Sequence, residues 1–494
     1  MKFLTKLEKS KQFWSLFVIC LVFFFLRLPS LIEPNWYGDE GIYQVIGQAM
    51  HSGRLLYSEI WDNKPPLLYV VYALINGDQQ AIRFISLFVG FFSTIVFFCL
   101  SQKLFRKLST SIISTSVFAI MIATPFLEGN IANAENFILL PIILAAFLIY
   151  SISKKKKFST LLPGLLLGIA FLFKIVAIFD LAAFLIFFLV IHLPQKISWS
   201  FLRSTHKTLI PQAALLLVGF FAPFLITVLY FASQGALKDF LQAAFAGNVD
   251  YVGYGNKFLN IPQGLLMLKV ALLSIASLFI LLKRDTFSKT ALFIIVWFLF
   301  SLFNAFFSQR PYTHYLLVLL PSFCLFVGLT FYIRTIYTRV IVIGLLMLTV
   351  FIVKENFWLS NLKKTISYYQ NATLFVTGQR NLNSYYSFFD EKTPRDYEVA
   401  SFIRTHTTAS DKVFIWGNNA QIYALSHRLP PGKYVVAYHI TQSERALEDT
   451  QKILSLTRPK YIIILSEATS VPFRIKEYSM RVVLEKAFVY ERNF

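Results

Sequence analysis

Long apolar runs separated by short polar segments make up the first two thirds of the chain. About eleven of these runs approach the roughly 20 residues that a helix needs to cross a bilayer. They predict membrane-spanning helices at residues 13–32, 81–102, 109–126, 135–152, 159–173, 175–193, 209–232, 262–282, 290–307, 315–333 and 339–354. The fifth and sixth runs form one stretch that is too long for a single crossing, so we expect a tight turn at Lys174.

The segment between the first two predicted spans contains shorter apolar stretches. Residues 65–76 are opened by a proline pair and closed by Asn76-Gly77-Asp78. Because this stretch is below spanning length, it predicts a helix lying at the outer membrane interface. Residues 44–50 predict a second short interfacial helix after the acidic pair Asp39-Glu40.

Residues 355–494 contain no spanning run and carry a soluble protein's share of charge. Strand and helix patterns alternate there, which predicts a small α/β domain with a mainly parallel sheet. We expect helices at residues 395–404, 420–426 and 443–456, and strands at 412–416, 434–438, 461–465 and 480–490. The predicted fold is therefore a polytopic α-helical membrane domain, residues 1–354, followed by an α/β domain, residues 355–494.

Basic residues predict how the chain is oriented. The net charge is +21, and Lys and Arg cluster in short segments between apolar runs, around Lys2–Lys11, Lys103–Lys107, Lys154–Lys157, Lys196–Lys207, Lys283–Lys289 and Arg334–Arg339. The positive-inside rule assigns such segments to the cytoplasm. With the amino terminus inside, the Asp39 segment, Glu128–Glu135, Lys174, Ser233–Pro262 and Gln309–His314 all fall outside. We therefore expect a multi-pass protein of the cell membrane. The odd number of spans places its α/β domain on the extracytoplasmic side.

Composition excludes several classes of protein. The chain is 56% apolar and 15% charged, whereas soluble domains carry about a quarter charged residues. The basic residues are explained by topology and attraction to anionic lipid, and no nucleic-acid-binding motif accompanies them. The three cysteines lie far apart in apolar runs, which argues against a disulfide framework or thiolate metal site. Without a glycine-rich phosphate loop, we expect no nucleotide cofactor.

The acidic pair Asp39-Glu40 follows Trp36-Tyr37, and Trp and Tyr prefer the headgroup level of a membrane. A carboxylate there could act as a general base on an acceptor hydroxyl or amine, provided that burial raises its pKa toward neutrality. Two carboxylates could instead hold a divalent cation, or the segment could be an ordinary solvated acidic loop. Lys64, before two prolines, could pair with a phosphate or simply extend toward the interface.

Other polar residues lie at predicted outer ends of spans. Glu135 opens a span, where an acid is favoured whatever its function. Arg310 and His314 could bind phosphate or sugar hydroxyls, although an outer arginine is also a common interfacial anchor. Arg83 and Lys174 run against the positive-inside trend, which makes them candidates for binding an anion.

Taken in order along the chain, these motifs resemble the glycosyltransferase C superfamily. The similarity is greatest to bacterial enzymes resembling protein O-mannosyltransferases (glycosyltransferase family 39) and lipid A aminoarabinose transferases. It covers roughly residues 10–350 and rests on Gly38-Asp39-Glu40 with the following Tyr43, Asp62-Asn63-Lys64-Pro65-Pro66, Arg83, Ala134-Glu135-Asn136 and Arg310-Pro311-Tyr312-Thr313-His314-Tyr315.

The resemblance implies a polyprenyl-phosphate-linked sugar as donor, transfer at the outer face, and usually inversion at the anomeric carbon. The acceptor would be a glycan, a lipid or a protein. Asp39 resembles the catalytic base, with Glu40 beside it and Glu135 at the second acidic position. Some relatives have Asp in place of Glu135. Whether Asp39 and Glu135 bind a divalent metal is therefore left open. The candidate phosphate-binding residues are Lys64, Arg83, Lys174, Arg310 and His314, and the candidate pocket residues are Trp36, Tyr43, Tyr57, Asp62, Asn136, Tyr312 and Tyr315.

Physical reasoning supports such a donor. An enzyme that uses nucleotide sugars would need a nucleotide-binding fold inside the cell, where this chain has only short basic segments. A departing lipid phosphate needs positive charge at the leaving oxygen. Residues 233–262, with Tyr251 and Tyr254, could form a lid over the donor or merely connect two spans.

Two rival functions come from other classes. A transporter or flippase of a lipid-linked substrate would place ionisable residues near mid-membrane and contain inverted repeats. The candidates here lie at the outer ends of spans, and we find no internal repeat. A scaffold or receptor would bind its partner through residues 355–494 alone.

Overall fold

A computed structural model describes residues 10–152, 159–192, 209–249, 252, 256, 263–359, 362–468 and 470–493. The chain forms two compact units. We call Met1–Leu28, Ser86–Tyr230 and Asn248–Thr365 the bundle unit. We call Pro29–Ile85, Phe231–Gly247 and Ile366–Phe494 the α/β unit. This division differs from a single cut at residue 354, because residues 29–85 pack with the carboxyl-terminal residues.

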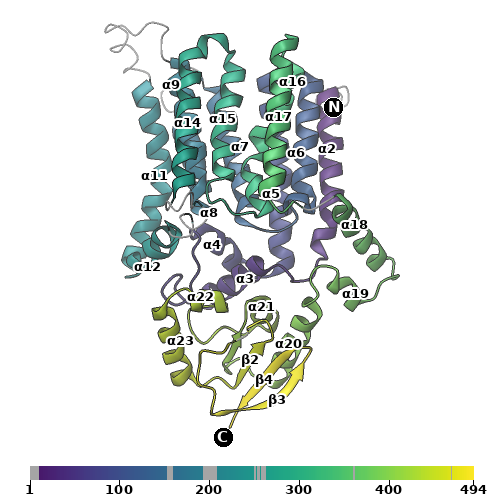
Figure 1. Cartoon of the computed structure of the whole chain (residues 1–494), viewed down its shortest axis with the longest axis vertical. Coiled ribbons are helices and arrows are strands. Elements are labelled where there is room, and N and C mark those ends of the chain that lie inside the picture. The colour runs from purple at the N-terminus through teal and green to yellow at the C-terminus, as the bar shows by residue number, and fades with distance from the viewer. Residues whose placement is uncertain are drawn as a thin grey trace, which may run out of the picture. The chain divides into compact units, whose positions relative to one another are not determined.

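Every apolar run that predicts a span is helical. The helices are α2 (Lys11–Arg27), α5 (Gln79–Phe105), α6 (Leu108–Ala123), α7 (Ala134–Ser151), α8 (Leu161–Phe173), α9 (Ile178–His192), α11 (Leu209–Ser233), α14 (Gly264–Lys283), α15 (Lys289–Ala305), α16 (Leu320–Tyr332) and α17 (Ile336–Asn356) (Figure 1). Among the described residues, seven helices are long and apolar enough to cross a membrane, while α6, α8, α15 and α16 are shorter. The structure is thus that of a polytopic membrane protein, and the number of eleven crossings stays a prediction.

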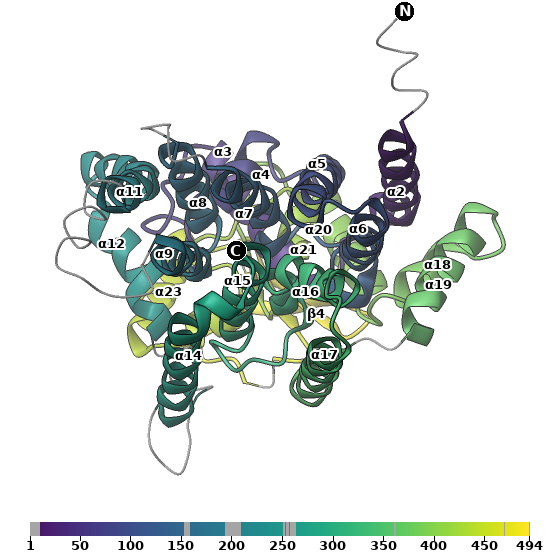
Figure 2. The same ribbon diagram turned by 90° about the horizontal axis from the view of Figure 1, so that it is seen from above.

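Burial within the bundle unit varies between helices. In α7, 67% of the most apolar window is buried, compared with 6% in α14 and 11% in α17. Viewed end-on, α14 and α17 lie at the rim of the bundle (Figure 2). A helix that is apolar all round and poorly covered by protein is suited to contact with lipid. We therefore expect α14 and α17 to face the acyl chains.

Glycines allow α8 and α11 to approach closely. A Cβ atom on Gly164 of α8 would lie 2.2 Å from the Leu216 carbonyl oxygen, and one on Gly219 of α11 would lie 2.2 Å from the Leu161 carbonyl oxygen. Small residues at such crossings bring helix backbones into contact. Lys174 then ends α8 in an extended conformation, with φ −156° and ψ 126°, before the 3₁₀ turn η3 (Ile175–Ala177). The predicted break at Lys174 is therefore confirmed.

The α/β unit contains a four-stranded sheet in the order β1-β2-β4-β3. Its strands are β1 (Val413–Trp416), β2 (Tyr461–Leu465), β3 (Tyr478–Leu484) and β4 (Ala487–Arg492) (Figure 1). Only β1 and β2 are parallel, whereas β4 pairs antiparallel with both β2 and β3. The prediction of a mainly parallel sheet is wrong, because the segment expected as one final strand folds back as a hairpin at Glu485-Lys486, where φ is positive.

The carboxyl-terminal region also contains the helices α18 (Leu362–Val376), α19 (Leu382–Ser387), α20 (Thr393–His406), α21 (Gln421–Ser426), α22 (Ala437–Thr441) and α23 (Glu444–Thr457). The three helices predicted in this region are present as α20, α21 and α23. The strand predicted at residues 434–438 is absent. Val435 and Val436 are buried without pairing to a strand, and α22 begins at Ala437, whose N–H donates to the Gly417 carbonyl at 2.8 Å.

Residues 29–85 form the helices α3 (Gly38–His51) and α4 (Leu67–Leu74) and the start of α5. The helix predicted at residues 65–76 is therefore confirmed, whereas the helix predicted at 44–50 begins six residues earlier. Asp39 and Glu40 consequently lie in the first turn of α3 rather than in a loop. Helix α3 packs tightly on α21, since a Cβ atom on Gly41 would lie 2.8 Å from the Gln421 nitrogen.

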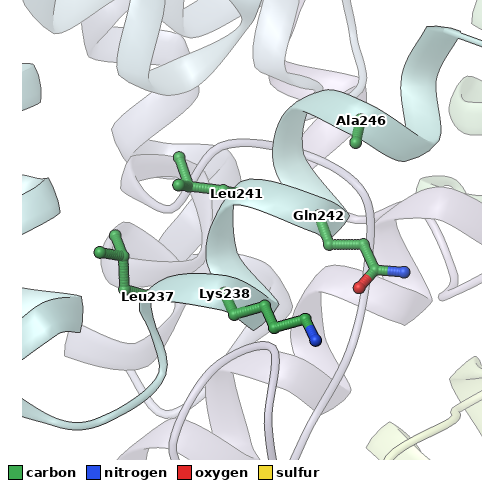
Figure 3. Close-up of a pocket in the computed structure, with 5 residues that line it drawn as sticks. All are labelled: Leu237, Lys238, Leu241, Gln242 and Ala246. Carbon is green, nitrogen blue, oxygen red and sulfur yellow. The ribbon is translucent and has the colours of Figure 1, made fainter.

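Residues 231–247 add α12 (Leu237–Leu241) and the π-helical turn η4 (Gln242–Ala246) to the α/β unit. An open, mainly apolar depression is lined by Leu237, Lys238, Leu241, Gln242 and Ala246 (Figure 3). Tyr251 and Tyr254 of the predicted lid lie outside the described residues. The basic clusters of residues 2–9, 154–157 and 196–207 also lie outside them.

Candidate active site

The two adjacent carboxylates of α3 have different environments. Successive residues of a helix point about 100° apart, so Asp39 and Glu40 face different neighbours. The Asp39 side chain is 38% exposed, whereas that of Glu40 is 0% exposed. Of this pair, Asp39 is therefore the carboxylate that a substrate can reach.

Glu40 forms a buried ion network with Arg83 near the start of α5. The Arg83 Nε and Nη2 atoms donate to the two Glu40 carboxylate oxygens at 3.0 and 2.6 Å. Its Nη1 atom lies 2.7 Å from Glu33 Oε2 and donates to the Ser30 carbonyl at 2.8 Å. Tyr368 of α18 also donates to Glu33, at 2.5 Å. Because Arg83 is 1% exposed and engaged by two carboxylates, this geometry favours a structural role over the predicted phosphate-binding role.

Lys64 lies between two carboxylates. Its Nζ atom is 3.6 Å from Asp39 Oδ2 and 3.9 Å from Asp62 Oδ2, and the side chain is 23% exposed. The Tyr43 hydroxyl donates to Asp39 at 3.0 Å, and the Lys64 ammonium lies 4.8 Å from the centre of the Tyr43 ring. The predicted residues Asp39, Tyr43, Asp62 and Lys64 are therefore brought together as one group, which we call the Lys64 cluster.

Buried tyrosines hold the backbone and neighbours of Lys64 in place. Tyr57 donates to the Lys64 carbonyl at 2.7 Å, and Tyr69 donates to Asp62 Oδ2 at 2.6 Å. Burial raises the pKa of both phenols well above their usual range, so they stay protonated. Tyr57 packs against Phe231 and Phe240 and is 1% exposed. Tyr57 is therefore a buried support of the Lys64 cluster. The Trp36 indole N–H donates to Glu33 at 3.1 Å, so this predicted pocket residue is engaged outside the cluster.

His439 of α22 also contacts this cluster, and the sequence analysis did not identify it. Its Nε2 atom lies 3.6 Å from Asp62 Oδ1, and its ring packs edge-on against Trp61 with centroids 5.0 Å apart. Burial lowers the pKa of His439 to about 4, an effect reinforced by Lys64 and opposed by Asp62 and Asp39. No local sequence pattern signals this contact, because His439 lies far from Asp62 along the chain.

This burial makes stability depend on pH. An unfolded histidine titrates near pH 6.5, so between about pH 6.5 and 4 the unfolded state binds the extra proton. The free energy of unfolding is therefore highest above pH 6.5. It decreases as pH falls toward 4, by up to about 3 kcal/mol. Thermal unfolding of the wild type and of His439→Gln should therefore diverge below pH 6.5, because glutamine does not titrate. Parallel pH curves would contradict this assignment.

A second polar cluster lies within the bundle unit, and we call it the Glu135 cluster. Glu135 lies in the first turn of α7 and forms an ion pair with Lys174. His314 Nε2 lies 3.7 Å from Glu135 Oε1, and His314 Nδ1 lies 2.8 Å from Glu128 Oε2. The predicted residues Glu135, Lys174 and His314 are therefore neighbours, with Glu128 as the additional member.

Aromatic and amide side chains frame the Glu135 cluster. The Lys174 ammonium lies 4.1 Å from the centre of the Tyr315 ring, and Tyr312 stacks on His314 with centroids 5.7 Å apart. Asn136 instead donates to the Ile131 carbonyl and closes the turn before α7.

The segment that carries Arg310 and His314 is tied to α14 by Lys269. The Lys269 ammonium donates to the Phe306 carbonyl and to Gln309 Oε1, both at 2.6 Å. Arg310 is half-buried in this segment.

Neither cluster is arranged like a metal site. Within the described ranges, no group of three His, Cys, Asp or Glu residues could hold a metal ion. Each proposed metal ligand also has an ammonium beside it, since Lys64 faces Asp39 and Lys174 faces Glu135. Asp39 and Glu135 belong to different units. The donors of either unit alone therefore do not fit a divalent cation.

Residues 64–237 match the family model described as dolichyl-phosphate-mannose-protein mannosyltransferase. This match confirms the resemblance to mannosyltransferase-like enzymes of the glycosyltransferase C superfamily. It includes Lys64, Arg83, Glu135 and Lys174, and it begins after Asp39. No curated protein matches the sequence.

Solved structures give the fold. ArnT from Cupriavidus metallidurans bound to undecaprenyl phosphate has a TM-score of 0.52 at 12% identity, over 97% of this chain and 98% of that chain. The apo state of the same protein has a TM-score of 0.51 at 12% identity, over 96% of each chain. The oligosaccharyltransferase of Archaeoglobus fulgidus, in complex with Zn and sulfate, has a TM-score of 0.47 at 12% identity, over 97% of this chain and 73% of that chain. The two ArnT comparisons show that the chain has an ArnT-like fold.

Proposed function

We propose that the protein is a membrane glycosyltransferase that moves a sugar from a polyprenyl-phosphate donor to an acceptor at the extracytoplasmic face, with Asp39 as general base. The observation that carries this proposal is the accessible Asp39–Lys64 pair at the start of α3. It supplies an acid–base group and a cation side by side, in a chain with the fold of an enzyme solved with undecaprenyl phosphate.

In the proposed reaction, Asp39 accepts a proton and Lys64 stabilises the departing phosphate. A hydroxyl or amine of the acceptor attacks the anomeric carbon, and its proton passes to the Asp39 carboxylate. The bond between that carbon and the phosphate oxygen breaks, and the polyprenyl phosphate leaves with the electron pair. Attack from the face opposite the phosphate inverts the configuration. The Asp39 carboxylate is accessible at the helix amino terminus, so a hydroxyl or amine of the acceptor can reach it.

Lys64 is suited to the departing phosphate because an ammonium is a compact charge that can contact several phosphate oxygens. Its ammonium lies over the Tyr43 ring, and its backbone is fixed by Tyr57 and two following prolines. Lys174 and His314 of the Glu135 cluster are further candidates for anion binding, as is Arg310. We assign Arg83 and Glu40 to holding α3 in position, since both are buried and paired with each other.

A binding experiment tests the donor assignment. Lys64→Met should weaken binding of undecaprenyl phosphate to the purified full-length protein at least tenfold, because a hydrogen bond to a charged group contributes about 1.5–3 kcal/mol. Affinity can be measured by native mass spectrometry in detergent.

Lys433→Met is a matched control, since Lys433 lies in the same unit, is 26% exposed and forms an ion pair of 3.6 Å with Asp449. This variant should bind within twofold of the wild type. Equal binding by Lys64→Met and wild type would remove the donor assignment.

A further inference from the structure

Within the α/β unit, α22 connects the sheet to the segment that carries Lys64. The Ala437 N–H donates to the Gly417 carbonyl at 2.8 Å, and the Tyr438 N–H donates to Asn418 Oδ1 at 3.1 Å. Both acceptors directly follow β1, at the carboxyl end of the parallel strand pair, where α/β folds commonly place functional groups. On the other side, the Trp61 N–H donates to the Lys433 carbonyl at 2.9 Å. Helix α22 is therefore bonded to the residues after β1, and it contacts the residues before Lys64 through the packing of His439 on Trp61.

His439 lies at the centre of this connection and is 3% exposed. Its Nδ1 atom is buried and has no hydrogen-bond partner among the described residues. Buried polar atoms are nearly always hydrogen-bonded, so one without a partner calls for an explanation. Packing alone does not explain why a histidine occupies this position, because a phenylalanine would fill the same space without burying a nitrogen.

The other ring nitrogen of His439 faces Asp62, just beyond hydrogen-bond distance at 3.6 Å. A neutral imidazole carries one N–H, and the tautomer protonated on Nε2 directs it at this carboxylate. Asp62 also accepts from the Tyr69 hydroxyl at 2.6 Å and from the Asn63 N–H at 2.8 Å. These groups restrict the Asp62 carboxylate to one orientation, and its Oδ2 atom faces the Lys64 ammonium.

We propose that His439 is a positioning residue for the lipid-phosphate site: it fixes Asp62, and Asp62 in turn holds the Lys64 ammonium in place. The carboxyl-terminal α/β region then completes a site whose charged groups come from the first outer segment. The identity of the ligand rests on the proposed function, whereas the positioning of Lys64 does not.

Two variants of the full-length protein separate positioning from packing. His439→Phe keeps an aromatic ring and removes both nitrogens, while His439→Gln places an amide near the Nε2 position. The first measurement is the rate at which an acylating reagent modifies the Lys64 amine, followed by peptide mass spectrometry and normalised to Lys433. We expect this rate to rise at least threefold in His439→Phe and to stay within twofold of wild type in His439→Gln.

The second measurement is the affinity for undecaprenyl phosphate. It should fall at least fivefold in His439→Phe and stay within twofold in His439→Gln. His406→Phe serves as the control, because His406 lies in the same unit, at the end of α20, and stacks on Phe402. It should change neither quantity.

The outcomes distinguish the two ideas. An unchanged Lys64 modification rate in His439→Phe, or equal damage in His439→Gln and His439→Phe, would overturn the positioning role. If wild type and Lys64→Met bind undecaprenyl phosphate equally, the donor assignment fails, and the modification rate still decides the positioning role. Should His439→Phe not fold, comparing His439→Gln with His439→Asn decides the question, because the shorter amide does not reach Asp62 and should behave as a loss.

Discussion

Replacing Asp39 with asparagine should lower the rate of sugar transfer by about 10²–10⁴-fold, the usual contribution of a general acid or base. Asparagine keeps the size of the side chain and can still accept the hydrogen bond from Tyr43. It cannot take up the acceptor's proton. The measurement is turnover of the purified variant with the donor and acceptor that the wild-type protein uses.

Asp449→Asn provides the matched control. Asp449 is 44% exposed and forms an ion pair of 3.6 Å with Lys433, which resembles the Asp39–Lys64 pair in exposure and length. It lies on α23, and its replacement should leave turnover within twofold. Near wild-type turnover of Asp39→Asn, with normal folding, would show that the base is another group.

Arg83→Met should destabilise the protein by about 3–5 kcal/mol, because it leaves the carboxylates of Glu33 and Glu40 buried without their counter-ion. Thermal unfolding of the purified protein in detergent measures the loss. Arg83→Lys should be only a partial rescue, since an ammonium cannot reproduce the two parallel bonds to Glu40.

Two comparisons make this result specific. Arg481→Met breaks an exposed ion pair with Glu491 and should cost less than about 1 kcal/mol. Adding Glu33→Gln and Glu40→Gln to Arg83→Met should recover part of the lost stability, because it removes the unpaired charges. If Arg83→Met unfolds like the wild type but loses affinity for undecaprenyl phosphate, Arg83 is a phosphate ligand rather than a structural residue.

The helices of the bundle unit could be predicted because each needs only a local pattern, a long apolar run between polar ends. The neighbours of Arg83 could not be predicted in the same way. A basic residue at the outer end of a span indicates anion binding when its surroundings are unknown. Glu33 and Glu40 reach it only because the chain turns back between α2 and α5.

The difference between Asp39 and Glu40 is also hidden in the sequence. In a loop, adjacent carboxylates would be equivalent, and only the helical turn at the start of α3 separates an exposed side chain from a buried one. The structure groups Asp39 with Lys64, and Glu135 with Lys174 and His314. The roles of these residues stay predictions.

In the α/β unit, the errors come from chain reversals. The hairpin between β3 and β4 turns at Glu485-Lys486, and neither residue type signals the positive φ that the turn requires. The apolar pattern around Val435 resembles that of a strand, but these residues are buried just before α22 without pairing to a strand. Strand pattern reports burial, whereas pairing depends on distant partners.

The pairing of residues 29–85 with the carboxyl-terminal region has a consequence for biosynthesis. Gln48 donates to the Ala424 carbonyl, 376 positions further along, so the face of α3 that packs on α21 stays uncovered until α21 has been made. Closing such distant contacts is slow and leaves apolar surface open to aggregation in the meantime. The polar residues of α3 therefore reach their final surroundings only after α21 has been synthesised.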